Sequence, residues 1–172
     1  MNNVQGIEKV DQKSSWQPQW MTVSKFVDCT PRNVFHKEME TEKEISVGEQ
    51  AKCQNLHILC RAEFETEADL ENVILKISAD DHYKVSLDGE FLMEGPFPSY
   101  VWKYYYDKIE GLNVAKGKHV LAVHLYYYGT VNRVCNSADF RCALAVELTT
   151  KQGESIPLAF QAQICQAYSG GI

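Results

Sequence analysis

A ten-residue stretch of the chain is crowded with side chains that form paired hydrogen bonds. It carries two amides, two guanidinium groups and a carboxylate: Asn132, Arg133, Asn136, Asp139 and Arg141. Planar groups of this kind bind sugar hydroxyls or the surface of another domain. The alternative is an internal Arg–Asp network that only holds a long loop in shape. The residue types favour neither interpretation, so both remain open.

An aromatic run precedes this polar stretch. Residues 100–106 include the rings of Tyr100, Trp102, Tyr104, Tyr105 and Tyr106. Aromatic faces stack on the C–H surfaces of sugars, and the polar edges of Tyr and Trp form hydrogen bonds. Alternate residues of a strand share one face, so part of the run could instead belong to the core. We take Tyr100, Trp102 and Tyr104, with the polar stretch, as candidates for carbohydrate binding or contact with another domain.

Acidic and imidazole side chains show no catalytic pattern. Asp80 and Asp81 precede a predicted strand, and as strand neighbours they would point to opposite faces and could not share a proton. No calcium-loop series surrounds them, so we expect turn and capping roles. His124 lies in a predicted buried strand without a nucleophile motif, and we expect a hydrogen-bonded core residue. The sequence therefore predicts no catalytic residue, no metal site and no cofactor.

Six cysteines are present, without a Cys-x-x-Cys pair. Cys60 is in phase with the apolar residues of segment 56–64, and Cys142 is in phase with those of segment 142–148. Free cysteine often fills such core positions. We therefore expect thiols rather than a disulfide framework.

The dominant hydrophobic period along the chain is two, which is typical of half-buried strands. The predicted strands are 56–64, 73–79, 83–87, 91–93, 101–106, 119–128, 142–148 and 156–164. Asp88-Gly89 between two of these strands predicts a type I′ hairpin turn. Residues 38–50 are interpreted as a loop or short edge element. Many short strands with little helix predict an all-β fold, an antiparallel β-sandwich.

The net charge of the chain argues against nucleic acid and membranes as partners. The chain has 17 basic and 23 acidic side chains, a formal net charge of −6. A net acidic chain repels phosphate backbones and anionic lipids, so we expect no nucleic acid and no membrane as partners. The first residues lack the basic and apolar regions of a signal peptide, which favours a cytoplasmic location.

Four segments together resemble one known family. Residues 79–92 contain a Tyr-x-Val-x-Leu-Asp-Gly hairpin. Residues 105–107 contain a Tyr-Asp step, and residues 112–123 contain a Gly-Lys turn that leads into a buried strand. Residues 16–21 form a Trp-rich opening, and residues 132–141 form a polar loop. In this order they resemble the amino-terminal, galactose-binding-like β-sandwich of bacterial α-L-rhamnosidases. The resemblance spans roughly residues 16–164.

The resemblance implies a jelly-roll sandwich that is separate from the catalytic domain. The family's catalytic carboxylates lie in a separate helical-barrel domain, so no residue of this chain inherits them. The implied function is a non-catalytic accessory domain whose partner is a downstream catalytic domain, with carbohydrate as a second partner. The alternative is a stand-alone carbohydrate-binding module of weak sugar affinity. The expected organisation is a flexible segment at 1–15, a sandwich at 16–168 and a tail at 169–172 cut from a longer chain.

Overall fold

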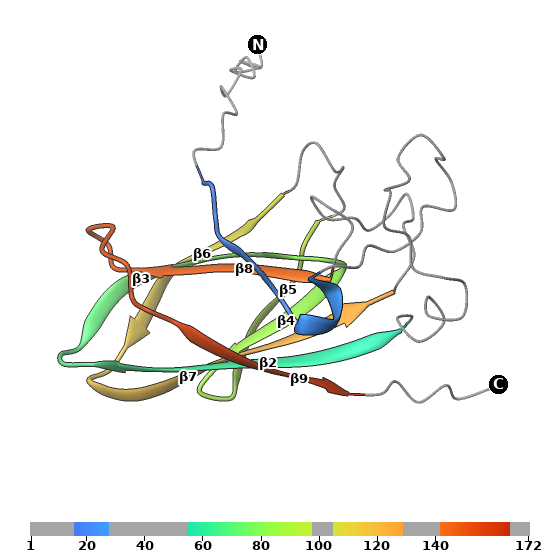
Figure 1. Ribbon diagram of the computed structural model, residues 1–172. Helices are drawn as coiled ribbons and strands as arrows, with labels where there is room; N and C mark the ends of the chain where they lie inside the picture. Colours follow the sequence, from blue (N-terminus) through green and yellow to red (C-terminus); the bar gives the residue numbers. More distant parts are fainter. Residues whose placement is uncertain (1–15, 28–54, 98–104, 129–141, 166–172) are drawn as a thin grey trace, which may run out of the picture.

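Two antiparallel sheets face one another in the computed structural model, which describes residues 16–27, 55–97, 105–128 and 142–165 (Figure 1). One sheet has the order β1-β8-β3-β6 and the other the order β5-β4-β7-β2-β9. The strands are β1 (Trp20–Thr22), β2 (Leu56–Thr66), β3 (Leu70–Ala79), β4 (His82–Leu87), β5 (Glu90–Gly95), β6 (Asp107–Val114), β7 (Gly117–Tyr127), β8 (Ala143–Thr149) and β9 (Ala159–Cys165), with a 3-10 turn, η1, at Ser24–Phe26. The predicted all-β antiparallel sandwich is confirmed.

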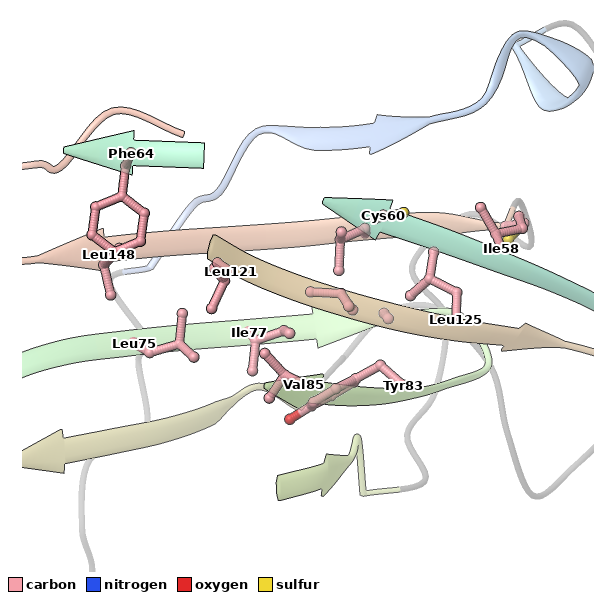
Figure 2. Packing of buried hydrophobic residues seen from close by; sticks show 14 of the residues in the cluster. Ile58, Cys60, Phe64, Leu75, Ile77, Tyr83, Val85, Leu121, Leu125 and Leu148 are labelled. Carbon is pink, nitrogen blue, oxygen red and sulfur yellow. The ribbon is translucent and has the colours of Figure 1, made fainter. Parts of the chain in front are cut away.

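The core lies between the two sheets and is built by strict alternation. In β2 every second residue from Leu56 to Phe64 is buried, while the residues between them are half-buried or exposed. Leu75 and Ile77 of β3 reach the same space from the other sheet, and neither has any exposed surface (Figure 2).

No helix among the described residues has the length and apolarity needed to cross a membrane.

Two of the cysteines lie in this core, as their phase predicts. Cys60 and Cys142 are buried, and both are free thiols, as is the half-buried Cys165. Burial raises the pKa of Cys60 to about 11. Burial, with the nearby carboxyls of Asp80 and Asp81, also raises the pKa of Cys142. The thiolate is the reactive form, so both side chains act as small apolar groups at neutral pH.

The longest strand pairing among the described residues joins β2 to β7. It runs without a shift from Leu56 opposite Tyr127 to Thr66 opposite Gly117. β2 pairs on its other side with β9, and β7 pairs on its other side with β4. The predicted strand 119–128 is therefore central, as its apolar composition on both faces indicated.

The β4–β5 hairpin turns at the predicted Asp-Gly pair. Asp88 and Gly89 have φ values of 52° and 85°, the left-handed region that a type I′ turn requires at both positions. Oδ1 of Asp88 accepts a hydrogen bond of 2.8 Å from the backbone N–H of Val120. The turn is thereby tied to β7, the strand beside β4.

The same aspartate also contacts a histidine. Nδ1 of His119 is 2.7 Å from Oδ2 of Asp88, and Nε2 is 2.7 Å from the carbonyl oxygen of Ala115. Two acceptors favour the imidazolium, which donates through both nitrogens. The hydrogen bond to Asp88 raises the pKa of His119 despite its burial. Burial raises the pKa of Asp88, but hydrogen bonds from His119 and Val120 outweigh it and the net shift is downward.

This pair predicts a pH dependence of stability. The raised pKa of His119 stabilises the fold below about pH 6.5, and this contribution is lost as the pH rises through the folded-state pKa. The lowered pKa of Asp88 stabilises the fold above about pH 4 and is lost on acidification. Asp88→Asn keeps a good turn residue, and we expect it to cost about 1 kcal/mol at pH 5.5, given the exposed carboxylate, and less at pH 9. Urea unfolding at both pH values measures this, and an equal loss at both would contradict it.

Several of the predicted strands differ from the structure. β6 begins at Asp107 and was not predicted, because it alternates weakly and contains Gly111 at a φ of 76° where its pairing with β3 shifts register. Tyr105 and Tyr106 of the predicted strand 101–106 precede β6 rather than form a strand, and residues 98–104 lie outside the described residues. β9 begins at Ala159 rather than Ile156. Segment 38–50 also lies outside the described residues.

Candidate functional site

All of the site residues predicted from the sequence fall outside the part of the chain that the structure describes. These are Tyr100, Trp102, Tyr104, Asn132, Arg133, Asn136, Asp139 and Arg141. Of the same aromatic run, Tyr106 contacts the buried Trp16 at a ring-centroid distance of 4.7 Å. Tyr105 is 40% exposed and contacts Phe97 edge-on at 5.9 Å. The run thus includes one ring that packs on a buried tryptophan and one that remains at the surface.

The described residues form a cleft on the outer face of the five-stranded sheet. Its volume is about 690 Å³. It is lined by His57, His82, Tyr83, Lys84, Glu94, Gly95, Pro96, His124 and Tyr126. These residues come from β2, β4, β5 and β7 and the residue that follows β5. The volume lies within the range of small-ligand sites.

Strand register brings the polar side chains of the cleft together. Tyr126 of β7 stands opposite His82 on one side and His57 on the other. Two residues along the sheet, Lys84 stands opposite both Glu94 and His124. Residues opposite one another in an antiparallel pair share a face, so these form two neighbouring rows. The buried residues between them, Tyr83 and Leu125 among others, point into the core instead.

A histidine pair bridges the two rows. Nδ1 of His57 is 2.7 Å from Nε2 of His124, and the two rings stack at 4.9 Å with an interplanar angle of 27°. The ring of Tyr126 lies 4.8 Å from that of His57, and its hydroxyl donates to Oδ1 of Asn55 at 3.0 Å. The expectation that His124 is a core residue is wrong. Its side chain is half-buried on the outer face, because the inward positions of β7 belong to the opposite parity.

Positive charges lie close to the ring of His124. Burial lowers the pKa of His124, and the positive charges of His57 and Lys84 lower it further. Lys84 lies 3.7 Å from Glu94, and both side chains are mostly exposed. Among the described residues that line the cleft, Glu94 is the only carboxylate.

Asp80 and Asp81 occupy one buried site, which corrects the expectation that they cannot share a proton. They are 2% and 4% exposed, and the peptide bond between them is cis. The Asp80 side chain hydrogen-bonds to Asp81, and Oδ2 of Asp81 accepts a bond of 2.7 Å from the backbone N–H of Tyr128. Burial raises the pKa of Asp81, which these bonds and the charge of His82 lower only in part. The pair fixes the β3–β4 connection to the end of β7.

The histidines of the cleft were not predicted as site residues from the sequence. His57 and His124 lie within the predicted strands 56–64 and 119–128, and His82 directly precedes the predicted strand 83–87. A single polar residue at such a position is ordinary. The signal that could have found them is three outward imidazoles, His57, His82 and His124, on three different strands. The register that brings these strands together is set by partners far apart in the chain.

The chain is similar to known proteins in structure but matches none of the compared families or curated proteins in sequence. No protein-family model matches the chain, and no curated protein matches it in sequence. A GH78 family rhamnosidase of Bacillus sp. GL1 is similar in structure with a TM-score of 0.57 and 21% identity, covering 64% of this chain and 12% of that one. An α-L-rhamnosidase of Streptomyces avermitilis, solved with L-rhamnose, gives a TM-score of 0.47 and 16% identity, covering 92% of this chain and 15% of that one. The chain thus spans about an eighth of the first protein's length, and its two-sheet sandwich has the fold of a β-rich part of a GH78 family rhamnosidase.

Proposed function

We propose that the chain is a non-catalytic accessory domain of an α-L-rhamnosidase-like glycoside hydrolase, which packs against a catalytic domain and contributes to substrate recognition. One observation carries the proposal: the structural similarity covers 64% of this chain but only 12% of the Bacillus rhamnosidase. This sandwich therefore resembles a minor part of a much larger enzyme.

The chemistry of the described cleft supports a non-catalytic role. Glycoside cleavage generally uses two carboxyl groups held about 5 to 10 Å apart across the scissile bond. Glu94 is the only carboxylate among the described lining residues, and it is paired with Lys84. Asp80 and Asp81 are both buried and are committed to each other and to the backbone of Tyr128.

Two exposed rings support packing against a further domain. Phe97, two residues after the end of β5, is 71% exposed, and it contacts Tyr105, which lies two residues before β6 and is 40% exposed. Large apolar side chains that gather at a surface mark interaction sites. Because the similar rhamnosidase is far longer than this chain, we assign the catalytic domain of a parent enzyme as the occupant of the Phe97–Tyr105 surface.

We expect the purified chain to leave an aryl α-L-rhamnoside unhydrolysed, since it offers no paired carboxylates in its described cleft. Release of nitrophenol, compared with buffer alone, measures this. The coding sequence that flanks these 172 residues should encode a catalytic domain, and the joined protein should hydrolyse the same substrate. Turnover by this chain alone, retained through repurification, would contradict the accessory role.

A stand-alone carbohydrate-binding module is the second candidate. The cleft favours it, because tyrosine and histidine rings stand beside charged groups there. We expect any affinity for a neutral monosaccharide to be weak, about millimolar, because a small hydrated ligand loses water bonds as it binds. A titration with L-rhamnose distinguishes the two candidates, since a domain that only packs against its parent enzyme shows no saturable response.

A further inference from the structure

The outer edge of β9 is open. β9 lies at one end of the five-stranded sheet, beside β2 (Figure 1). Alternate residues of an antiparallel strand direct their N–H and C=O groups away from the neighbouring strand. No described residue hydrogen-bonds to these outward groups of β9. Ala162 is exposed although it stands opposite the buried Cys60 on the core side of the sheet. A row of backbone donors and acceptors therefore faces solvent along β9.

The other described edge strands carry features that discourage pairing with a further strand. β1 has only three residues. β5 contains two glutamates, is followed by Pro96, and pairs with β4 through a register shift. β6 contains Asp107, Lys108 and Glu110, and its pairing with β3 is irregular. Short length, charge, proline and bulges are the usual protections of a sheet edge.

β9 has none of these protections. Its seven residues, Ala159–Cys165, include no charged residue, no proline and no glycine. Its pairing with β2 runs without a shift from His57 opposite Cys165 to Glu63 opposite Ala159. The edge is therefore regular and uncharged, and it fits an extended, uncharged segment that adds a strand to the sheet.

The sequence of β9 is complementary to itself when two copies run antiparallel. With Ala162 opposite its own copy, Phe160 stands opposite Ile164. Gln161 then stands opposite Gln163 on the other face. An aromatic side chain beside a β-branched one is a favourable cross-strand pair, and two amides can hydrogen-bond to each other. Phe160 and Ile164 are only partly buried against their own core, so this pairing covers them further.

We propose that β9 pairs antiparallel with β9 of a second copy of this chain, about a two-fold axis at Ala162. The two five-stranded sheets then form one continuous sheet. Such a contact uses the same edge on both copies and closes on itself as a dimer. Phe97 follows β5, at the opposite end of the sheet, so the contact is separate from the Phe97–Tyr105 surface. The inference does not rest on the proposed function.

Sedimentation velocity of the full chain under reducing conditions, from about 1 µM to about 200 µM, tests the proposal. One strand pair is a small interface, so we expect a monomer–dimer equilibrium with a dissociation constant of about 10 µM. A chain that stays monomeric at about 200 µM overturns the proposal. Assembly beyond a dimer overturns the two-fold contact.

Two double variants that differ only at position 163 test the pairing. Both contain Gln161→Glu, which stands opposite Arg61 of its own chain. With Gln163→Glu, carboxylates face each other across the dimer, and we expect at least roughly tenfold weaker dimerisation. With Gln163→Lys, opposite charges face each other, and the dissociation constant should stay within about threefold of that of the unmodified chain. An equal effect of the two double variants overturns the proposal.

A control at the other end of the sheet separates this contact from the packing surface. Phe97→Ser alters the surface that we assign to a catalytic domain and should leave dimerisation unchanged. Loss of the dimer in this variant would place the contact at that surface and would overturn the role of β9. Circular dichroism checks that each variant is folded.

A cross-link tests the register and needs no charged variant. Ala162→Cys places the thiols of two copies opposite each other at a Cα separation of about 5 Å, within the reach of a disulfide. After mild oxidation we expect a covalent dimer in which both linked peptides contain position 162. The unmodified chain is the control, because its Cys165 stands opposite Ala159 of the second copy and has no thiol to pair with there. Absence of the link between the two copies of position 162 overturns the proposed register.

Discussion

Asp81→Ala is expected to lower the free energy of unfolding by about 3 kcal/mol, because it removes a buried acceptor and leaves a backbone donor without its bond. Asp81 is 4% exposed, and its Oδ2 accepts from the N–H of Tyr128 at 2.7 Å. The substitution also removes one partner of the buried Asp80. Urea denaturation at neutral pH measures the loss.

Two further variants isolate the cause. Oδ1 of Asp69 also accepts from a backbone N–H, that of Lys116 at 2.7 Å, but at an exposed position. Water replaces the lost bond there, so Asp69→Ala should cost less than about 1 kcal/mol. Asp81→Asn retains an acceptor and should also cost less than about 1 kcal/mol at neutral pH. An equal cost for the two alanine variants would contradict the role of burial.

The sign of the pH effect at Asp81 follows from its raised pKa. The folded state holds this proton more tightly, so the contribution is full below about pH 4 and is lost as the pH rises through the folded-state pKa. The amide introduced by Asp81→Asn cannot take up the proton, so the deficit of this variant should be larger at about pH 4 than at about pH 7. A deficit that grew with pH would mean that burial does not govern this carboxyl.

Gly95→Ala is expected to cost about 3 kcal/mol, as the sum of overpacking and a lost buried hydrogen bond. A Cβ at Gly95 would overlap Oδ2 of Asp107 and approach the hydroxyl oxygen of Tyr83 to 3.0 Å. That hydroxyl donates to the same Asp107 oxygen at 2.6 Å, and Tyr83 is only 1% exposed. The added methyl group must therefore displace Asp107 and break the bond.

A double-mutant cycle tests this explanation. In an Asp107→Ala background the main obstacle to the methyl group is absent, and Gly95→Ala should then cost about 1 kcal/mol. Thermal or urea unfolding of the four proteins gives the coupling. Additive costs would show that the glycine is required for another reason. Burial raises the pKa of Tyr83, and the Asp107 carboxylate raises it further, so the tyrosine remains a donor throughout the accessible pH range.

The sequence predicts strands well where one face is buried and alternation is strict. β2 and β4 were predicted to within two residues, because their apolar residues recur at every second position. The Asp88-Gly89 turn was predicted because both positions require positive φ, which they have. β6 was missed because it alternates weakly and its pairing with β3 is irregular.

The candidate site was beyond prediction for a different reason. Periodicity indicates which side chains share a face within one strand, but not which strands become neighbours. His57 and His124 are 67 residues apart, and only the β2–β7 register brings them into contact. Asp80 and Asp81 were assigned opposite faces because regular strand geometry was assumed, whereas both side chains are buried at the connection that follows β3. The roles of residues 100–104 and 132–141 remain predictions.

The position of β2 has a consequence for biosynthesis. β2 is the first strand of its sheet to leave the ribosome, yet its partners β7 and β9 end at Tyr127 and Cys165. Contacts between such distant segments form late, because chain entropy opposes closure of the intervening loop. Until then, the 11 residues of alternating apolar sequence in β2 present two unpaired edges. The nascent chain is therefore most exposed to aggregation and chaperone binding before β9 is made.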